Sequence, residues 1–420
     1  MRVTIMPGAL SGTVDPVISS KSVTHRVLIC AALSGEPTRV ERVAPSADAL
    51  ATQGCLEAMG CRIQEREDGL EIVPGSLPTQ ALMDCGESGS TLRFMLPVAA
   101  ALGIHTRFTG RGKLPQRPLS PLYEEMTAHG VSLSPRGVFP LEVKGRLQAG
   151  TYALAGNVSS QFITGLLMAL PLTAGDSTLR LLTPLESASY VGITLEVLRR
   201  FGIRVAAEGD LFRIPGGQRY QSPGVAVIEG DWSGAAFWLA AGALSGAGVT
   251  CRGLNAASVQ GDRAILPLLR AFGARVTEED DRITVQREAL RGIEIDAGDI
   301  PDLVPVLAAV AAFAEGRTVI RRIARLRLKE SDRVETVLGL IRSLGGRAEA
   351  TEQEMTVFGG GLHGGRVDAC GDHRIAMAAA VAGSACAHPV EILGAECVAK
   401  SYPGFFEVFR NLGGKADSMV

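Results

Sequence analysis

The sequence predicts a soluble α/β protein of two domains, built from six copies of one unit in which sheets surround buried helices. Three observations carry this prediction. The chain has 420 residues, too many for one ordinary core. A helical run that ends in glycine recurs about every 70 residues. A second helix, rich in alanine and apolar on nearly every side, precedes each of these runs.

The glycine-ended helices define the repeat. A glycine after the last periodic residue is a common helix stop, and a short β-like stretch, a polar turn and a second stretch usually follow it, as in residues 61–73. The six glycines are Gly60, Gly130, Gly202, Gly273, Gly345 and Gly413.

The alanine-rich helices, such as "FMLPVAAAL" and "IAMAAAVAGSA", imply burial on every side. The unit is therefore helix, strand, helix, strand, strand, with a linking strand before it. The sixth unit is cut short. Three units a domain is the natural division, which predicts one domain over residues 20–228 and another over 229–420, with residues 1–19 packing against the second.

The composition excludes several classes of protein. A net charge of −2 gives no basic excess for nucleic acid, and no apolar run reaches the roughly 18 residues of a membrane helix. No leader pattern opens the chain. The eight cysteines are scattered without a CxxC pair, and no cluster has metal-ligand spacing. We therefore expect a cytoplasmic protein with reduced thiols and no metal site.

Polar residues concentrate where the helices begin, in stretches such as "SKSVTHR", "GESGSTLR", "NVSSQF" and "GDHRIA". Helix N-termini offer free N–H groups and a positive dipole end, which suit phosphates and carboxylates. Lys21, His25 and Arg26 add cations to an end that is already positive, so a negative partner is expected there. Further cations at helix starts are Arg117, Lys329, Arg333, His373, Arg374 and Lys400.

If equivalent helices point the same way, these starts meet at one surface of each domain, and two facing surfaces would form an anion-binding cleft. Each motif alone has a plainer explanation as a helix cap or a solvated ion pair. Together they repeat one structural position with charge-recognising residues. Two carboxylates, Asp302 and Glu330, stand among the cations and are candidates for proton transfer.

The ordered motifs "SSKSVTHR", "GESGSTLRF", "QRPLSPL", "NVSSQF", "SASY", "IPD", "LKESDR", "GDHRIAM" and "AKSYPGFF" resemble those of the 5-enolpyruvylshikimate-3-phosphate synthase family along essentially the whole chain. The resemblance implies a two-domain inside-out α/β barrel with three βαβαββ units in each domain. It also implies transfer of the enolpyruvyl group of phosphoenolpyruvate to the 5-hydroxyl of shikimate 3-phosphate, with release of phosphate through a tetrahedral intermediate. It implies no metal, no organic cofactor and a monomer.

The resemblance also assigns roles to residues. Lys21, Asp302 and Glu330 match catalytic positions. The positions that match shikimate 3-phosphate contacts are Lys21, Ser22, Arg26, Ser159, Ser160, Gln161, Ser187, Tyr190, Asp302, Arg325 and Lys329. Those that match phosphoenolpyruvate contacts are Lys21, Gly89, Arg117, Gln161, Arg333, His373, Arg374 and Lys400.

Four positions depart from the family's commonest pattern. Glu87, Arg325 and His25 stand where asparagine is frequent, and Ser90 stands where threonine is frequent. These departures bear on affinity and on the response to glyphosate, which competes for the phosphoenolpyruvate pocket in this family, rather than on the reaction.

Two alternatives stay open from the residues. The sister family, UDP-N-acetylglucosamine enolpyruvyl transferase, has the same fold and donor, but it carries a cysteine in the loop before the Arg-Pro pair, where this chain reads "GRGKLPQRP". A non-catalytic anion-binding protein is opposed only by Asp302 and Glu330. A ring that encircles DNA is disfavoured because it needs a basic lining.

Overall fold

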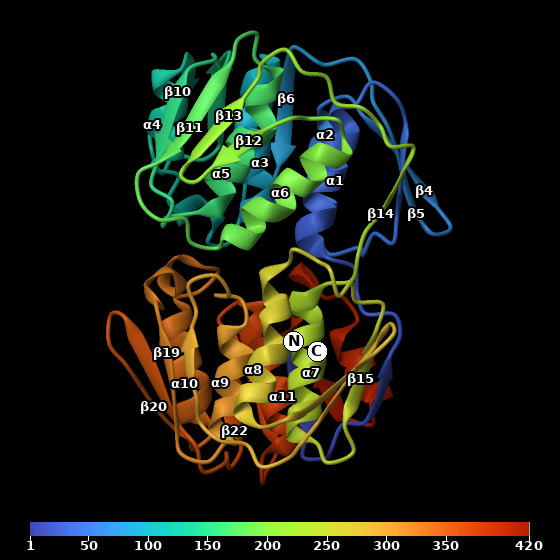
Figure 1. The fold of residues 1–420 in the computed structure, drawn as a ribbon, viewed down its shortest axis with the longest axis vertical. Coiled ribbons are helices and arrows are strands. Elements are labelled where there is room, and N and C mark those ends of the chain that lie inside the picture. The colour runs from blue at the N-terminus through green and yellow to red at the C-terminus, as the bar shows by residue number, and fades with distance from the viewer. Residues whose placement is uncertain (420) are drawn as a thin grey trace. The chain divides into compact units, whose positions relative to one another are not determined.

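Among residues 1–419, which the computed structural model describes, the strands form six four-stranded sheets, one for each predicted repeat (Figure 1). The chain divides into two compact units. One is Lys21–Ile228, and the other combines Met1–Ser20 with Glu229–Val420. Each unit has its own hydrophobic core and three of the sheets.

The third repeat shows the unit in full, as a strand, a helix, a strand, a helix and two strands. Strands β10 and β11 are parallel because a helix crosses between them, and the last two strands form a hairpin. The sheet order is β10-β11-β13-β12. Its elements are β10 (Thr151–Leu154), α5 (Ser160–Ala169), β11 (Ser177–Leu181), α6 (Ala188–Arg200), β12 (Ala206–Glu208) and β13 (Leu211–Ile214).

The other two repeats of this unit follow the same plan. The first contains α1 (Lys21–Leu33), β3 (Thr38–Glu41), α2 (Ala47–Ala58), β4 (Arg62–Arg66) and β5 (Gly69–Val73). The second contains β6 (Gln80–Asp84), α3 (Gly89–Leu102), β7 (His105–Thr109), the 3₁₀ turn η1 (Leu114–Gln116), α4 (Leu122–Ala128), β8 (Val131–Leu133) and β9 (Leu141–Gly145).

The second unit holds repeats four to six. Repeat four contains α7 (Trp232–Leu244), β15 (Val249–Arg252), η3 (Gly261–Ala264), α8 (Ile265–Phe272), β16 (Arg275–Glu279) and β17 (Arg282–Gln286). Repeat five contains β18 (Glu294–Asp296), α9 (Val304–Ala312), β19 (Arg317–Arg321), η4 (Ala324–Leu328), α10 (Arg333–Ser343), β20 (Arg347–Ala350) and β21 (Glu354–Phe358). Repeat six contains β22 (Gly365–Asp368), α11 (His373–Ala385), β23 (Val390–Leu393), η5 (Ala395–Lys400), α12 (Phe405–Asn411) and β24 (Lys415–Met419).

Three strands complete repeats that lie far away in the sequence. Strand β14 (Val225–Val227) pairs with β3 as the linking strand of the first repeat, and β2 (Gly12–Val14) pairs with β15 in the fourth. Strand β1 (Arg2–Met6) lies between β23 and β24, in the place that β13 takes in the third repeat. The N-terminal strand thus supplies what the shortened sixth unit lacks.

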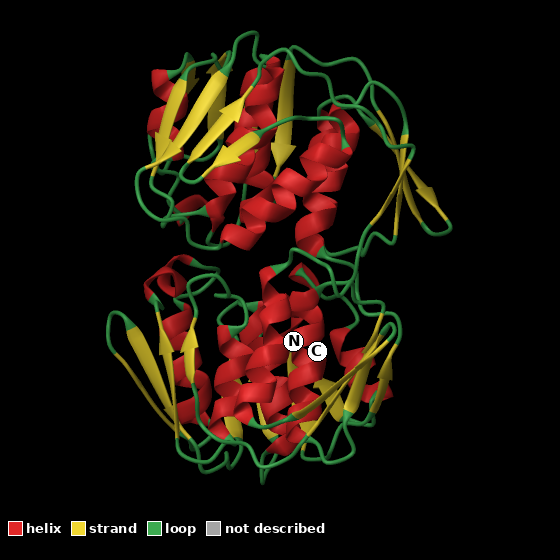
Figure 2. Cartoon of the chain, viewed as in Figure 1, coloured by secondary structure: helices red, strands yellow, loops and turns green. Residues whose placement is uncertain are grey.

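The alanine-rich helices form the cores, as their composition predicts. Every residue of α7 and α9 is buried, and α3, α5 and α11 are buried along almost their whole length. Figure 2 shows strands flanking the helices of each unit. The apolar surface is therefore matched by sheets on several sides, which is how helices without a polar face become stable.

The six predicted helix-ending glycines all have a left-handed backbone, with φ between 76° at Gly202 and 102° at Gly60. Residues other than glycine rarely adopt this backbone conformation. In α8, for example, Gly273 caps the helix by donating its N–H to the Arg270 and Leu269 carbonyls. Within residues 1–419, no helix is long and apolar enough to cross a membrane.

Candidate active site

The negative partner expected at the start of α1 is supplied for Lys21 by the protein itself. The Lys21 ammonium donates a hydrogen bond to the Asp48 carboxylate at 2.8 Å, and both side chains are largely buried. Asp48 lies in the first turn of α2, where an acid also suits the helix dipole. Sequence analysis did not single out Asp48, because a first-turn acid reads as an ordinary dipole partner.

Arg26 is buried against neighbouring helices. Its guanidinium donates to the Thr194 hydroxyl at 2.8 Å, to the Tyr190 carbonyl at 3.0 Å and to the Ser22 carbonyl at 2.7 Å. A further hydrogen bond reaches the Thr164 hydroxyl at 3.3 Å. Burial lowers the pKa of Arg26 to about 10, so the residue stays cationic at neutral pH. The predicted positions Ser22, Arg26 and Tyr190 therefore meet at one end of α1 and α6.

Gly89 and Arg117 lie in contact. Gly89 is the first residue of α3, whose N-cap is Ser88. A Cβ atom added at Gly89 would lie 2.5 Å from Nη1 of Arg117, so a larger residue here would displace this guanidinium. The contact places a cation beside the N-terminus of α3. Both features attract an anion, which suits the phosphoenolpyruvate contact that the sequence predicts here.

Gln161 lies in a partly buried network that includes Arg93, a residue absent from the predicted set. Its amide nitrogen donates to the Ser90 hydroxyl at 2.9 Å, and its amide oxygen accepts from Arg93 at 2.5 Å. Arg93 also donates to the Pro118 carbonyl, next to Arg117. Arg93 is the last residue of the motif "GESGSTLR", but an arginine inside an apolar helix gives no sequence signal of its partners.

The predicted serines stand at helix starts. Ser159 is the N-cap of α5 and accepts from the Gln161 N–H, and Ser160 is the first residue of that helix. Ser187 is the buried N-cap of α6, with φ 55° and ψ 44°. A left-handed conformation at a residue other than glycine costs about 1–3 kcal/mol and is typical of functional sites. Arg42, Asp280, Arg322 and Cys370 also have a positive φ, so the backbone at Ser187 agrees with the motif without singling that residue out.

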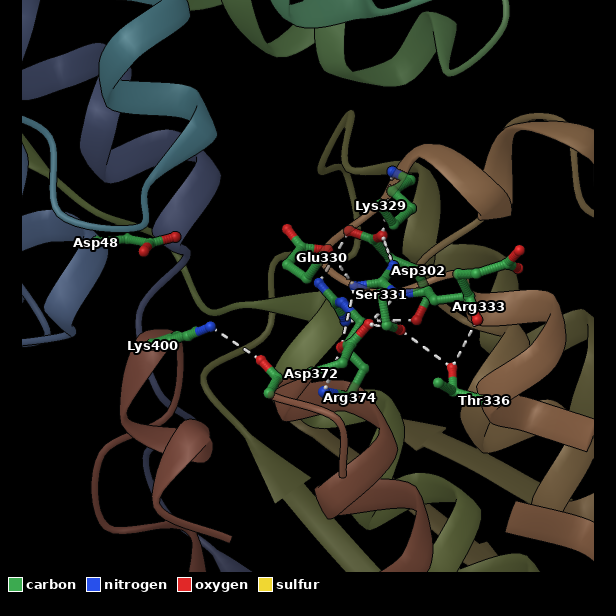
Figure 3. A network of polar contacts seen from close by, with 12 residues as sticks. Asp48, Asp302, Lys329, Glu330, Ser331, Arg333, Thr336, Asp372, Arg374 and Lys400 are labelled. Carbon is green, nitrogen blue, oxygen red and sulfur yellow. Dashed lines mark hydrogen bonds and ion pairs between the residues drawn. The ribbon is translucent and has the colours of Figure 1, made fainter. Parts of the chain in front are cut away.

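In the other unit, the predicted residues gather around Arg333 (Figure 3). This side chain is fully buried at the start of α10 and reaches three carboxylates. It donates to Asp302 at 2.6 Å, to Glu330 at 2.8 Å and to Asp372 at 2.8 Å. Burial disfavours the cation, but these three acids outweigh it and raise the pKa of Arg333 well above its usual value.

Asp302 accepts from three cations. Besides Arg333, the Arg374 guanidinium lies 2.9 Å from its carboxylate and the Lys329 ammonium lies 3.4 Å away. Burial lowers the pKa of Lys329 to about 8. Asp302 opposes this shift, while Arg333 and Arg325 add to it. Three cations thus surround one carboxylate and fix its position.

Asp372 is the third carboxylate of this cluster, and it connects Arg333 with the start of α11. It is the N-cap of α11, accepting from the Arg374 N–H, and it also binds Ser331 at 2.9 Å. Burial raises its pKa, but Arg333 outweighs this and the net shift is downward. His373 is the first residue of α11, and the Lys400 ammonium donates to the Gly371 carbonyl at 2.9 Å. From sequence, Asp372 was recognisable as a helix cap but not as the partner of Arg333.

The sequence singles out mainly the cations of this site, but in the structure carboxylates accompany them. Lys329, Arg333 and Arg374 are paired with Asp302, Glu330 and Asp372, so the charges of these six groups balance. An anion that binds at these cations would have to compete with carboxylates that already hold them.

Comparison with known proteins places the chain among enolpyruvyl transferases. The family described as EPSP synthase (3-phosphoshikimate 1-carboxyvinyltransferase) matches residues 5–409. A 3-phosphoshikimate 1-carboxyvinyltransferase from Clostridium kluyveri is 44% identical over 99% of this chain and 98% of that protein. One from Clostridium acetobutylicum is 41% identical over 98% of this chain and 97% of that protein.

Solved structures agree. An EPSP synthase from Acinetobacter baumannii superposes with a TM-score of 0.83 at 26% identity, over 99% of this chain and 100% of that one. The enolpyruvyl transferase NikO from Streptomyces tendae, at 21% identity and a TM-score of 0.78, covers 99% of this chain and 98% of its own. The second likeness concerns the fold alone. The inside-out α/β fold that the motifs imply is confirmed by the first.

Proposed function

The chain belongs to the EPSP synthase (3-phosphoshikimate 1-carboxyvinyltransferase) family, and from that premise we propose which of its residues carry the reaction. The protein transfers the enolpyruvyl group of phosphoenolpyruvate to shikimate 3-phosphate and releases phosphate, a step of the shikimate pathway. The observation that best supports the residue roles is the buried cluster of Asp302, Glu330, Lys329, Arg333 and Arg374.

In the addition step, the 5-hydroxyl oxygen of shikimate 3-phosphate bonds to C2 of phosphoenolpyruvate. Asp302 takes the hydroxyl proton, and its three cationic neighbours fix the position of its carboxylate. Glu330 enters this step as the carboxylic acid and gives its proton to the methylene carbon, which becomes a methyl group, so that Glu330 is left as a carboxylate. Lys21 is the second candidate for the hydroxyl proton and contributes to both substrates.

In the elimination step, the tetrahedral intermediate returns a methyl proton to the Glu330 carboxylate. The double bond re-forms as the C2–O bond to phosphate breaks. Both steps keep several negative charges together, so fixed cations stabilise them electrostatically. Glu330 lies 2.8 Å from Arg333, which fixes the orientation of its carboxylate.

The binding roles divide by position. Shikimate 3-phosphate is bound by Lys21, Ser22, Arg26, Ser159, Ser160, Gln161, Ser187, Tyr190, Asp302, Arg325 and Lys329. Phosphoenolpyruvate is bound by Lys21, Gly89, Arg117, Gln161, Arg333, His373, Arg374 and Lys400. The contact of Gly89 with Arg117 and the shared partner of Arg333 and Arg374 support the second set. The enzyme acts as a monomer in the cytoplasm, the usual form in its family.

The variant Glu330→Gln tests the proton-transfer role. We expect a folded protein that binds both substrates but loses most turnover, because an amide neither gives nor accepts the proton. In D₂O the wild type exchanges deuterium into the methylene group of phosphoenolpyruvate and product when shikimate 3-phosphate is present, and the variant does not.

Glu335→Gln is the matched control. Glu335 lies in the same helix start, is exposed and pairs with Arg327 outside the cluster. We expect normal turnover and exchange from it. Near-normal exchange in Glu330→Gln would remove Glu330 from the mechanism.

A further inference from the structure

His25 is a buried imidazole in the cationic first turns of α1. It lies one turn after Lys21 and next to Arg26, and its ring meets Phe94 of α3 edge-on at 6.3 Å between centroids. Burial lowers the pKa of His25 well below its ordinary value, and the charges of Lys21 and Arg26 lower it further. The ring is therefore neutral at neutral pH, and only one of its two nitrogens carries a proton. The hydrogen bonds around the ring decide which nitrogen this is.

A chain of hydroxyl groups begins at this ring. Nδ1 of His25 lies 2.7 Å from the Thr52 hydroxyl in α2, which lies 2.7 Å from the Thr91 hydroxyl in α3. The Thr91 hydroxyl donates to the Ser88 hydroxyl oxygen at 2.8 Å. Four side chains from α1, α2 and α3 are thus joined in one buried line.

The direction of the chain follows from counting protons. Each threonine hydroxyl has one proton, and each could give it to the Asp48 carbonyl at 3.4 Å or to a closer hydroxyl. The shorter contacts are the better hydrogen bonds, so Thr91 gives its proton to Ser88 at 2.8 Å and accepts from Thr52 at 2.7 Å. Thr52 then accepts from His25, which requires the proton on Nδ1. Nε2 is buried without a hydrogen-bond partner in the described part of the chain, and in this tautomer it is a bare acceptor rather than a stranded donor.

One end and the middle of this chain adjoin residues to which the proposed function gives substrate contacts. Ser88 is the N-cap of α3, which begins at Gly89 beside Arg117. The Asp48 carbonyl oxygen lies 3.4 Å from both threonine hydroxyls, and the Asp48 carboxylate holds Lys21. A shift of this line would move the start of α3 relative to Lys21.

We propose that His25 is a positioning residue, which acts through Thr52 and Thr91 to fix the start of α3 and the Asp48–Lys21 pair relative to each other. This inference rests on the proposed function for the roles of Gly89, Arg117 and Lys21. An imidazole reaches Thr52 while its ring packs against Phe94.

The test compares steady-state kinetics of His25→Phe, Thr52→Val and the double variant. Phenylalanine keeps the ring and its packing but has no N–H, and valine keeps the shape of threonine without the hydroxyl. We expect each single variant to raise KM for phosphoenolpyruvate roughly five-fold, KM for shikimate 3-phosphate less, and to change kcat less than about two-fold. The double variant should match the single ones, because both break the same chain.

Two further variants separate positioning from stability. Thr52→Ser restores the hydroxyl and should restore KM, even if His25→Phe fails to fold. Tyr220→Phe removes another buried hydrogen bond of the same unit, from the Tyr220 hydroxyl to the Met168 carbonyl, and should lower only the melting temperature.

An unchanged KM for phosphoenolpyruvate in Thr52→Val, or strictly multiplied effects in the double variant, would overturn the proposal. Wild-type turnover with shikimate 3-phosphate is measured first, so that a failure of the proposed function is distinguished from a failure of this inference.

Discussion

Replacing Arg333 by methionine is expected to destabilise the protein strongly, because it leaves buried acids without their cation. Arg333 is 1% exposed and Asp372 is fully buried. Methionine fills similar space but donates nothing to Asp302, Glu330 or Asp372. Removing one partner of a buried ion pair typically costs about 3–5 kcal/mol. For a folding unit of roughly 200 residues, this lowers the melting temperature by about 6–20 °C.

The loss of stability in Arg333→Met is expected to depend on pH in one direction. In the wild type the pKa of Asp372 is lowered, since Arg333 outweighs burial. The stability that its ionisation contributes is therefore complete above its unfolded pKa of about 4, and it is lost as the pH falls through the lower folded value. In Arg333→Met, burial and the charge of Glu330, which both raise the pKa of Asp372, are no longer outweighed by Arg333. The difference in free energy of unfolding between the wild type and Arg333→Met is then largest near neutral pH. It becomes smaller as the pH falls towards about 5.

Thermal unfolding followed by circular dichroism, between about pH 5 and pH 8, measures both effects. Arg327→Met is the control, because Arg327 makes the same kind of pairs, with Asp332 and Glu335, on the surface. It should cost at most about 1 kcal/mol. The view that Arg333 holds this cluster together would be refuted if Arg333→Met lost less than about 1 kcal/mol of unfolding free energy. It would also be refuted if the difference in unfolding free energy from the wild type grew as the pH fell.

Two more variants test the binding roles. Lys21→Met should weaken equilibrium binding of both substrates at least several-fold, because the residue contributes a charge to each. Unchanged affinity for either substrate would contradict that role. In the free enzyme Lys329 loses its proton around pH 8, so the affinity for shikimate 3-phosphate should fall as the pH rises through that value. Lys329→Arg, which stays charged, should remove this fall, and an identical pH profile would show that another group causes it.

Much of the fold could be predicted from the sequence because its signals are local. A glycine that must adopt a left-handed backbone, as at Gly273, marks a helix end within a few residues. The apolar composition of helices such as α7 predicts that they are buried on all sides. The completion of the sixth repeat by β1 could not be predicted, because strand pairing between residues 2–6 and 415–419 leaves no local pattern.

The candidate site shows the same limit. The motifs point to Lys21, Asp302, Glu330 and Arg333, since charged residues at helix starts are recognisable one by one. Their partners are not, because the pairing of Lys21 with Asp48 is decided by packing between two helices. For the same reason, the sequence indicates that Lys21 needs a negative partner but not that the Asp48 carboxylate supplies it.

The most direct test of the central claim is phosphate release from phosphoenolpyruvate by the wild type, with shikimate 3-phosphate in one assay and UDP-N-acetylglucosamine in another. Release only with shikimate 3-phosphate, with 5-enolpyruvylshikimate 3-phosphate as the second product, is the predicted result. Release with UDP-N-acetylglucosamine instead, or with neither acceptor, would contradict the account.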